Sequence, residues 1–144
     1  MGAVASKYLA APNSDLPGYV HVSSRGLSDV AGGAAFLGAQ HGQLKLEGIK
    51  PPGNLTAPAG INASADAGRD QLRLQFNQRF TKRRSKALTE AYDASYDQAT
   101  RLMGRKAMFE GKASKQDLER YGTHDFGRYC LLARSLLENG AACV

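Results

Sequence analysis

The sequence pattern changes near residue 68, and this change restricts the possible folds more than any other feature of the chain. Most of the sixteen glycines and all five prolines lie before it, which predicts loops and short strands. After it, Leu72, Phe76 and Phe80 recur at every fourth residue, the spacing of one face of a helix. We therefore predict that the 144 residues form a single partial domain, loop-rich with short strands over 1–67 and helical over 68–140.

The clearest strand in the first half lies over Tyr19–Ser23. Val20 and Val22 alternate there with polar or amphipathic neighbours, as in a half-buried strand. The other elements expected in this half are a helix over Gly2–Ala10, a loop with a short helical turn over 26–42, a short strand over Leu44–Glu47 and a surface connection over 51–67. Met1 directly adjoins the first helix and leaves no room for a capping residue, so we expect sequence upstream of it.

Helices dominate the second half. The helix containing Phe76 and a second helix over Lys86–Met103 are predicted to form a hairpin that packs on another part of the protein. A third helix is expected over His124–Glu138, ended by Asn139 and Gly140. The residues expected to face inward are Leu88, Tyr92, Ala99 and Met103 in the second helix and Phe126, Cys130, Ala133 and Leu137 in the third.

The last four residues, Ala141–Val144, form an apolar run typical of the beginning of a buried parallel strand. We therefore expect the missing N-terminal and C-terminal parts of a larger parent domain to be the partners of this chain. Nineteen Lys and Arg residues against thirteen Asp and Glu residues give a net charge of +6, which favours encounters with anions but identifies no partner. The sequence has no signal peptide and no apolar run long enough to span a membrane, so we expect no membrane contact.

Candidate reactive and metal-binding residues are few. His21, His41 and His124 have no helix-face spacing of the kind that holds a metal, and Cys130 and Cys143 lack a CxxC spacing. Cys130 lies on the predicted apolar face of a helix, which indicates a core residue and not a nucleophile.

The basic run Lys82–Lys86 lies at a helix junction, where the helix dipole favours cations. It has no interleaved aromatic residues for stacking on bases, so nucleic acid is not an expected partner.

Four segments of the chain carry a resemblance to a known family. They are Leu16-Pro-Gly-Tyr-Val, then Arg25-Gly-Leu-Ser-Asp-Val with Gly33-Ala-Ala-Phe-Leu-Gly-Ala-Gln, then Ala91-Tyr-Asp-Ala-Ser-Tyr-Asp-Gln-Ala, and Arg120-Tyr-Gly-Thr-His-Asp-Phe-Gly-Arg-Tyr-Cys-Leu-Leu-Ala-Arg. In order and spacing they closely resemble the bacterial family called domain of unknown function 1501, over nearly the whole chain. His41 stands where that family usually has a tyrosine, which argues against a ligand role there.

The family in turn resembles a branch of the alkaline phosphatase and sulfatase superfamily. This resemblance implies an α/β fold, in which helices flank a mostly parallel sheet and divalent metals bind beyond the carboxyl ends of the strands. Members of the family are much longer than this chain, are common in planctomycetes and usually carry a twin-arginine export signal. The resemblance thus implies a parent protein exported to the periplasm or cell envelope.

In the superfamily a metal activates a nucleophile that attacks a phosphate or sulfate ester, so the resemblance implies an anionic ester as the substrate of the parent. The metal-ligand segments of the family, Gly-Gly-Pro-Ser, Trp-Asp-x-His and Asp-His, do not occur in this sequence. We therefore expect no catalytic residue, metal ligand or cofactor in this chain, and a divalent metal only in the full-length parent.

Two functional hypotheses follow. In the first, the chain is a structural internal segment of a metal-dependent hydrolase and is inactive alone. If the strand over Tyr19–Ser23 is parallel in the sheet of the parent, its carboxyl end faces the metal site, and Arg25 can offer a bidentate guanidinium to a bound oxyanion. In the second, the chain is a non-catalytic interaction module that acts through the helical hairpin over Gly68–Met103 and its basic end.

Overall fold

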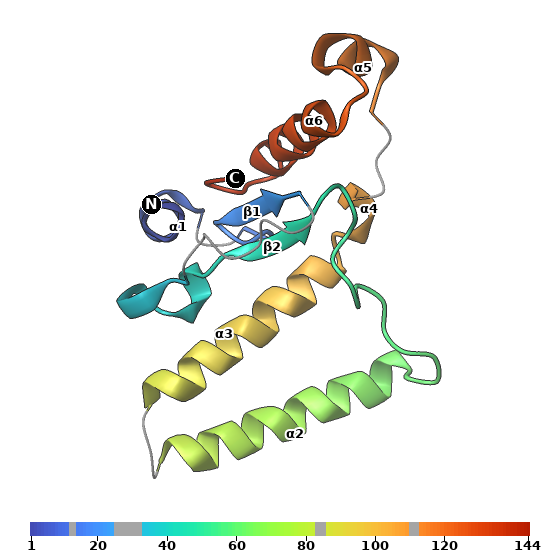
Figure 1. Ribbon diagram of the computed structural model, residues 1–144. Helices are drawn as coiled ribbons and strands as arrows, with labels where there is room; N and C mark the ends of the chain where they lie inside the picture. Colours follow the sequence, from blue (N-terminus) through green and yellow to red (C-terminus); the bar gives the residue numbers. More distant parts are fainter. Residues whose placement is uncertain (12–13, 25–32, 83–85, 110–112) are drawn as a thin grey trace.

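The computed structural model describes residues 1–11, 14–24, 33–82, 86–109 and 113–144, and its fold is α/β. Two parallel strands, β1 (Val20–Ser23) and β2 (Leu44–Glu47), lie at its centre (Figure 1). Their register pairs Val20 with Leu44 and Ser23 with Glu47. Both predicted strands are confirmed. Two short helical turns, η1 (Ala35–Leu37) and η2 (Ala39–His41), precede β2 within the predicted loop.

A third segment lies parallel to β1 along the edge opposite β2. The Val20 N–H donates to the Cys143 carbonyl at 2.9 Å, and the Cys143 N–H donates to the Gly18 carbonyl at 3.0 Å. The Tyr19 carbonyl points the other way and accepts from the Leu44 N–H at 2.9 Å, so β1 lies between its two neighbours. The prediction of a parallel strand beginning in the apolar run after residue 140 is confirmed at this one bridge.

Helices lie on both sides of the strands. In Figure 1, α6 (Asp125–Glu138) lies on one side and α3 (Lys86–Met103) on the other, with α2 (Ala63–Thr81) beyond α3. The buried core joins these layers, because one cluster contains residues from α6, α3 and both strands. Its members are Leu16, Val20, Leu46, Leu102, Phe109, Leu136 and Ala141.

The first helix, α1 (Gly2–Leu9), packs against the residues that lead into β1. Ser6 is buried there, and a side-chain carbon added at Gly18 would lie 2.5 Å from its hydroxyl oxygen. A glycine is therefore needed at position 18 for the close approach of helix and strand. As predicted, α1 has no side-chain cap, because Met1 occupies the N-cap position and makes no capping hydrogen bond.

The first helix of the hairpin, α2, begins earlier than the predicted residue 68. α2 starts at Ala63, within the segment that was expected to be a surface connection, because the Asn62 side chain accepts a hydrogen bond of 2.8 Å from the Ala65 N–H and caps the helix. α2 and α3 form the predicted hairpin and run antiparallel in Figure 1. Two short helices that the sequence did not predict follow, α4 (Lys106–Phe109) and α5 (Lys115–Tyr121).

The third predicted helix is confirmed as α6, but its predicted inner face is wrong. Phe126 and Leu137 are exposed, Cys130 and Ala133 are half-buried, and Leu136 is completely buried. Gly127 explains the rotation, because a side-chain carbon there would lie 2.1 Å from the Tyr121 carbonyl oxygen. Because glycine has no side chain, the start of α6 can lie directly against the end of α5, and this approach sets the rotation of α6.

The predicted inner face of α3 is also displaced. Tyr92 and Ala99 are exposed and Met103 is half-buried, whereas Thr89 and Leu102 are buried. Leu88, the fourth residue expected on that face, has a side chain outside the described part of the structure.

Candidate functional site at the helix hairpin

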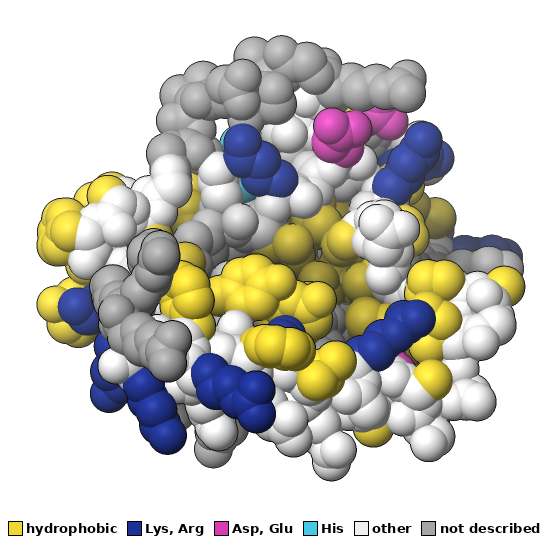
Figure 2. Space-filling view, turned by 90° about the horizontal axis from the view of Figure 1, so that it is seen from below, with side chains coloured by type: hydrophobic (Ala, Val, Ile, Leu, Met, Phe, Trp, Pro, Cys, Tyr) yellow, Lys and Arg dark blue, Asp and Glu magenta, His cyan; other side chains and the backbone are white. Residues whose placement is uncertain are grey.

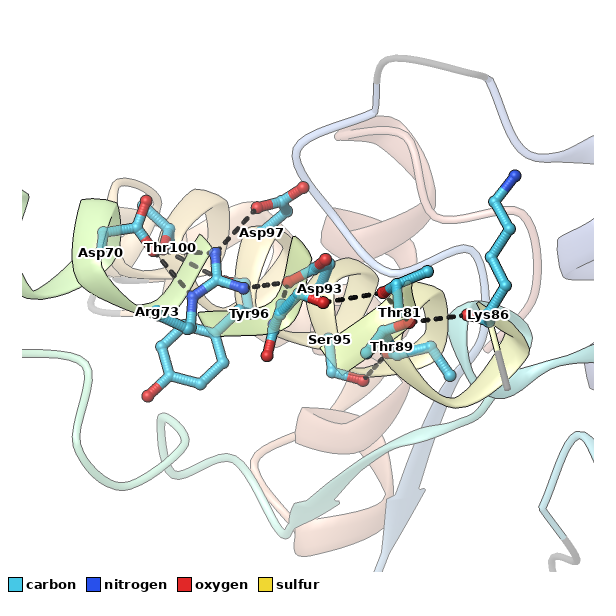
Figure 3. A network of polar contacts seen from close by, with 12 residues as sticks. Asp70, Arg73, Thr81, Lys86, Thr89, Asp93, Ser95, Tyr96, Asp97 and Thr100 are labelled. Atoms are coloured by element: carbon cyan, nitrogen blue, oxygen red, sulfur yellow. Dashed lines mark hydrogen bonds and ion pairs between the residues drawn. The ribbon is translucent and has the colours of Figure 1, made fainter. Parts of the chain in front are cut away.

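A network of polar contacts joins α2 to α3, with Arg73 toward one end of it and Thr81 and Thr89 toward the other (Figure 3). The Arg73 guanidinium donates to Asp93 across the hairpin and to Asp70 on its own helix, where Nε lies 2.9 Å from Oδ1. Asn77 donates to the same Asp93 oxygen at 2.7 Å. A third carboxylate, that of Asp97, lies 4.0 Å from Arg73. Two helices are thus joined through one guanidinium and its neighbouring carboxylates.

The Arg73 side chain is only 11% exposed and is charged in this position. Burial acts to lower its pKa, but hydrogen bonds and charge attraction with Asp70, and then with Asp93, outweigh burial and raise the pKa above its ordinary value. The guanidinium carbon also lies 4.4 Å from the centre of the Tyr96 ring, a cation–π distance. Charge pairs and stacking on the Tyr96 ring therefore hold the Arg73 side chain in position.

The other end of the hairpin is held by two hydroxyl groups. The oxygens of Thr81 and Thr89 lie 2.8 Å apart, and Thr89 is buried. Each hydroxyl also lies within hydrogen-bond distance of a carbonyl of its own helix, Thr81 of Asn77 at 2.8 Å and Thr89 of Lys86 at 2.9 Å. We call the contacting residues the polar seam; they are Arg73, Asn77 and Thr81 of α2 and Thr89, Asp93 and Asp97 of α3. The seam explains why Thr89, a polar residue, is buried in α3.

The seam fixes where the apolar residues of α2 point. Each seam residue of α2 directly follows one of Leu72, Phe76 and Phe80, and consecutive helical residues are rotated by about 100°. The apolar stripe therefore lies roughly a quarter turn away from α3, and all three of its side chains are exposed. The predicted stripe exists, but the helices meet along a different line.

Two tyrosines of α3 extend this apolar surface. Tyr92 and Tyr96 directly precede Asp93 and Asp97, so they are rotated from the seam in the same sense as the stripe on α2. Because the two helices are antiparallel, this rotation brings both sets to the same side of the hairpin. We call this surface the hairpin face; its five exposed residues are Leu72, Phe76, Phe80, Tyr92 and Tyr96.

The charges beside the hairpin face are basic. Arg69 precedes Leu72 by three residues and Arg79 follows Phe76 by three, so each adjoins the stripe on the helix surface. Within the described residues neither arginine has an ion pair, whereas the nearby aspartates are drawn into the seam. Figure 2, which views the molecule from below, where α2 lies in Figure 1, shows hydrophobic side chains gathered on this side of the molecule with Lys and Arg side chains around them.

A cleft of about 610 Å³ lies between α4, α5 and α6. Met108, Leu118 and Leu132 are among its apolar lining, and Arg134 at its rim pairs with Asp117 at 3.1 Å and with Glu138 at 2.8 Å. These pairings leave the rim nearly balanced in charge.

The cysteines and histidines predicted to have no site role are placed by the structure as follows. Cys130 and Cys143 are free thiols and are half-buried, so Cys130 is not the core residue that was predicted. His124 accepts a hydrogen bond from the Gly127 N–H and caps α6, and His41 lies 3.5 Å from the Ser6 hydroxyl. His21 lies in β1, and its buried Nδ1 has no hydrogen-bond partner among the described residues.

The remaining site predictions fall wholly or partly outside the described residues. Arg25, the predicted oxyanion-binding residue, lies there, as does the middle of the basic run, 83–85. Of its two ends, Lys82 follows α2 and Lys86 pairs with Glu90 at 3.3 Å. In the part of the chain that the structure describes, no three His, Cys, Asp or Glu side chains could hold a metal ion. No helix in that part is long and apolar enough to cross a membrane.

The polar seam was missed in the sequence, although a signal for it exists. Arg73, Asn77 and Thr81 recur at every fourth residue, parallel to the apolar stripe and one position later. The apolar spacing dominates a prediction from sequence, because burial of apolar side chains is the usual reason that helices associate. A polar stripe of equal regularity is the pattern that would have revealed the seam.

Comparison with known proteins identifies a family that the chain matches. Residues 1–144 match the family described as "Protein of unknown function (DUF1501)". No curated protein and no solved structure shows significant similarity to the chain. The match covers the strands, the hairpin and α6 alike, and it agrees with the resemblance carried by the four sequence segments. The chain belongs to the DUF1501 family.

Proposed function

We propose that the chain is a structural internal segment of a larger, exported hydrolase. The parent would have an α/β fold and act on phosphate or sulfate esters with the help of a divalent metal. The observation that carries the structural part of this proposal is the parallel pairing of Cys143 with Tyr19. It makes β1 a central strand with a parallel neighbour on each side. Parallel strands are typical of sheets that continue and are covered by helices on both faces.

The edge of β1 opposite β2 supports this interpretation. Backbone groups of successive residues alternate between the two edges of a strand, so Val22 points to the same edge as Val20. The described pairing there ends at the hydrogen bond between Val20 and Cys143. Among the described residues the rest of this edge is unpaired, and an unpaired edge invites a further strand. A continuing strand from the parent would pair with Val22.

The hydrolase part of the proposal rests on the resemblance to the alkaline phosphatase and sulfatase superfamily. The described residues do not form a metal site, and we derive no catalytic step from them. The role of this chain is therefore to build the sheet and its covering helices, while the ligands of the metal come from other parts of the parent. Arg25 remains the one residue proposed to contact the oxyanion.

Hydrogen exchange at the Val22 amide tests the structural role. In the 144-residue chain we expect this amide to exchange faster than that of His21, which points toward β2. In a longer form of the protein both amides should be protected. Equal, slow exchange of the two amides in the short chain, or no gain of protection at Val22 in the longer form, would contradict the proposal.

The longer form also tests the chemistry. It should hydrolyse aryl phosphates or aryl sulfates in the presence of zinc, calcium or manganese, and chelation should abolish the activity. An Arg25→Ala variant should bind phosphate, sulfate or vanadate more weakly by a few kcal/mol at most, the value of about one charge-assisted pair. Calorimetry that gives equal affinities for the variant and the unchanged protein would remove Arg25 from the proposed site.

A second function, that of an interaction module, is favoured by the hairpin face. Phe76, at 59% exposed, lies among four other exposed large apolar side chains. Contiguous apolar patches on monomeric proteins are often functional, and this one is held outward by a specific polar seam. The two functions are compatible, because the hairpin face and the open edge of β1 lie on different elements.

A further inference from the structure

We propose that the hairpin face binds an amphipathic helix of a partner protein whose apolar stripe is flanked by aspartate or glutamate residues. The proposal rests on the interaction function and names the chemistry of its partner. Three features carry it: the rigid outward orientation of the face, its apolar area and the sign of the charge around it.

Orientation comes first, because an apolar surface can bind only if it does not collapse onto its own protein. Rotating α2 so that Phe76 met α3 would break the contacts of Arg73 with Asp93 and of Thr81 with Thr89. Breaking a largely buried charge contact is costly, since it leaves the remaining group without a partner. The polar seam therefore holds the hairpin face open.

The size of the face suits a helix. Each of its five side chains is about half exposed, and a large aromatic side chain carries on the order of 200 Å², so the face offers roughly 500 Å² of apolar surface. That is near the upper end of about 300–600 Å² for the largest apolar patch of a monomer. Leu72, Phe76 and Phe80 lie along two turns of α2, and Tyr92 and Tyr96 lie beside them. Two adjacent rows of this kind offer an apolar surface along which a helix can pack.

Charge selects among helical partners. Arg69 and Arg79 adjoin the stripe without ion pairs in the described part of the chain, and the chain as a whole carries a net charge of +6. Asp70, Asp93 and Asp97 gather around Arg73 along the seam, so Arg69 and Arg79 are the charged side chains that adjoin the stripe itself. A helix with acidic flanks would gain attraction at both ends of the stripe, and a helix with basic flanks would meet repulsion.

The same charges disfavour a second copy of the chain as the occupant. Two hairpin faces packed together would place the arginines beside Leu72 and Phe76 in one copy against their equivalents in the other. An anionic membrane is disfavoured as well, because α2 has only one narrow apolar stripe. Both alternatives are outcomes of the experiment that follows.

The test uses the full 144-residue chain and two labelled synthetic peptides, each a helix of about 20 residues with a leucine stripe, long enough to span the face. One peptide has glutamate flanks and the other has lysine flanks. Fluorescence anisotropy should show at least about tenfold tighter binding of the glutamate peptide at low salt, with the difference shrinking at high salt.

Matched variants locate the site on the chain. Phe76→Ser should weaken binding of the glutamate peptide by about tenfold or more, whereas Phe126→Ser, which removes an exposed phenylalanine from α6, should leave it unchanged. Arg79→Glu should weaken it by several-fold, roughly the effect of one surface charge pair and its reversal, and Lys115→Glu on α5 should not. Circular dichroism would verify that every variant keeps its helices.

Each other outcome overturns a defined part of the proposal. Tighter binding of the lysine peptide, or binding only to vesicles of phosphatidylcholine and phosphatidylserine, would overturn the acidic helix as the partner but leave the hairpin face as an interaction surface. Self-association in sedimentation that Phe76→Ser abolishes would replace the partner by a second copy. Failure of both peptides, the vesicles and self-association would overturn the interaction function itself, without affecting the test at the edge of β1.

Discussion

Replacing Arg73 by leucine removes the only guanidinium of the polar seam and tests whether that seam holds α2 in place. The substitution deletes the guanidinium that donates to Asp93 and Asp70 and stacks on Tyr96. It leaves the carboxylates of Asp70, Asp93 and Asp97 close together without their shared cation. α2 has no buried residue that could compensate, so the loss falls directly on the contact between α2 and α3.

The magnitude can be estimated from these contacts. A hydrogen bond to a charged group contributes about 1.5 kcal/mol at the low end, which suits the partly exposed Asp93, and the more exposed Asp70 adds about 0.5 kcal/mol. The stacking on Tyr96 adds about 0.5–1 kcal/mol. Burial of the new leucine returns about 1 kcal/mol. We therefore expect Arg73→Leu to destabilise the hairpin by about 2 kcal/mol.

Hydrogen exchange of the α2 amides, resolved by NMR, measures this loss locally, and urea unfolding followed by circular dichroism measures it globally. Arg79→Leu is the matched control, because Arg79 lies on the same helix outside the seam and should change stability by no more than about 0.5 kcal/mol. Equal protection of α2 in the two variants would refute the claim that Arg73 holds the hairpin.

Three further predictions concern other parts of the molecule. Gly127→Ala should destabilise the chain by about 2 kcal/mol or more in thermal unfolding, because the added carbon would lie 2.1 Å from the Tyr121 carbonyl oxygen. Gly68→Ala is the control: it has open space around it inside α2 and should stabilise the chain by about 0.5–1 kcal/mol. The Ser114 hydrogen bond chiefly, and the charge of Arg134 after it, lower the pKa of Asp117 against the opposing effect of burial. The stability that Asp117 contributes is therefore present above its ordinary pKa and is lost as the pH falls through the lowered one, so an acid titration of helicity should show a smaller loss in Ser114→Ala than in the unchanged chain. The chain alone should not hydrolyse aryl phosphates or aryl sulfates with zinc, calcium or manganese added, and metal-dependent turnover that survives repurification would contradict this.

The elements of the fold were largely predictable from the sequence, because local rules determine them. Strand alternation at Val20 and Val22, the helical spacing of the second half and the apolar run after residue 140 all identify elements that the structure contains. Missing from the prediction were the early start of α2 and the short helices α4 and α5. Asn62 and Ser114, the caps of α2 and α5, are single residues whose signals are weak beside a long periodic pattern.

Helix rotation was not predictable, since periodicity identifies residues that share a face but not which face meets the rest of the protein. In α6 the close contact of Gly127 with Tyr121 decides the rotation and buries Leu136 instead of Leu137. In the hairpin the contact of Thr81 with Thr89 belongs to a polar seam that overrides the apolar stripe. In α2 the sequence contains both an apolar stripe and a regular polar stripe, and only the contacts with α3 decide which of them meets the other helix.

The most direct test of this account is the solvent accessibility of the hairpin face. A soluble paramagnetic agent broadens the NMR signals of exposed protons far more than those of buried ones. The account predicts strong broadening of the Phe76 and Phe80 ring signals and weak broadening of the methyl signal of Thr89, which is only 7% exposed. Protected phenylalanine rings together with an exposed Thr89 methyl group would show that α2 packs through its apolar stripe, and would contradict both the polar seam and the hairpin face.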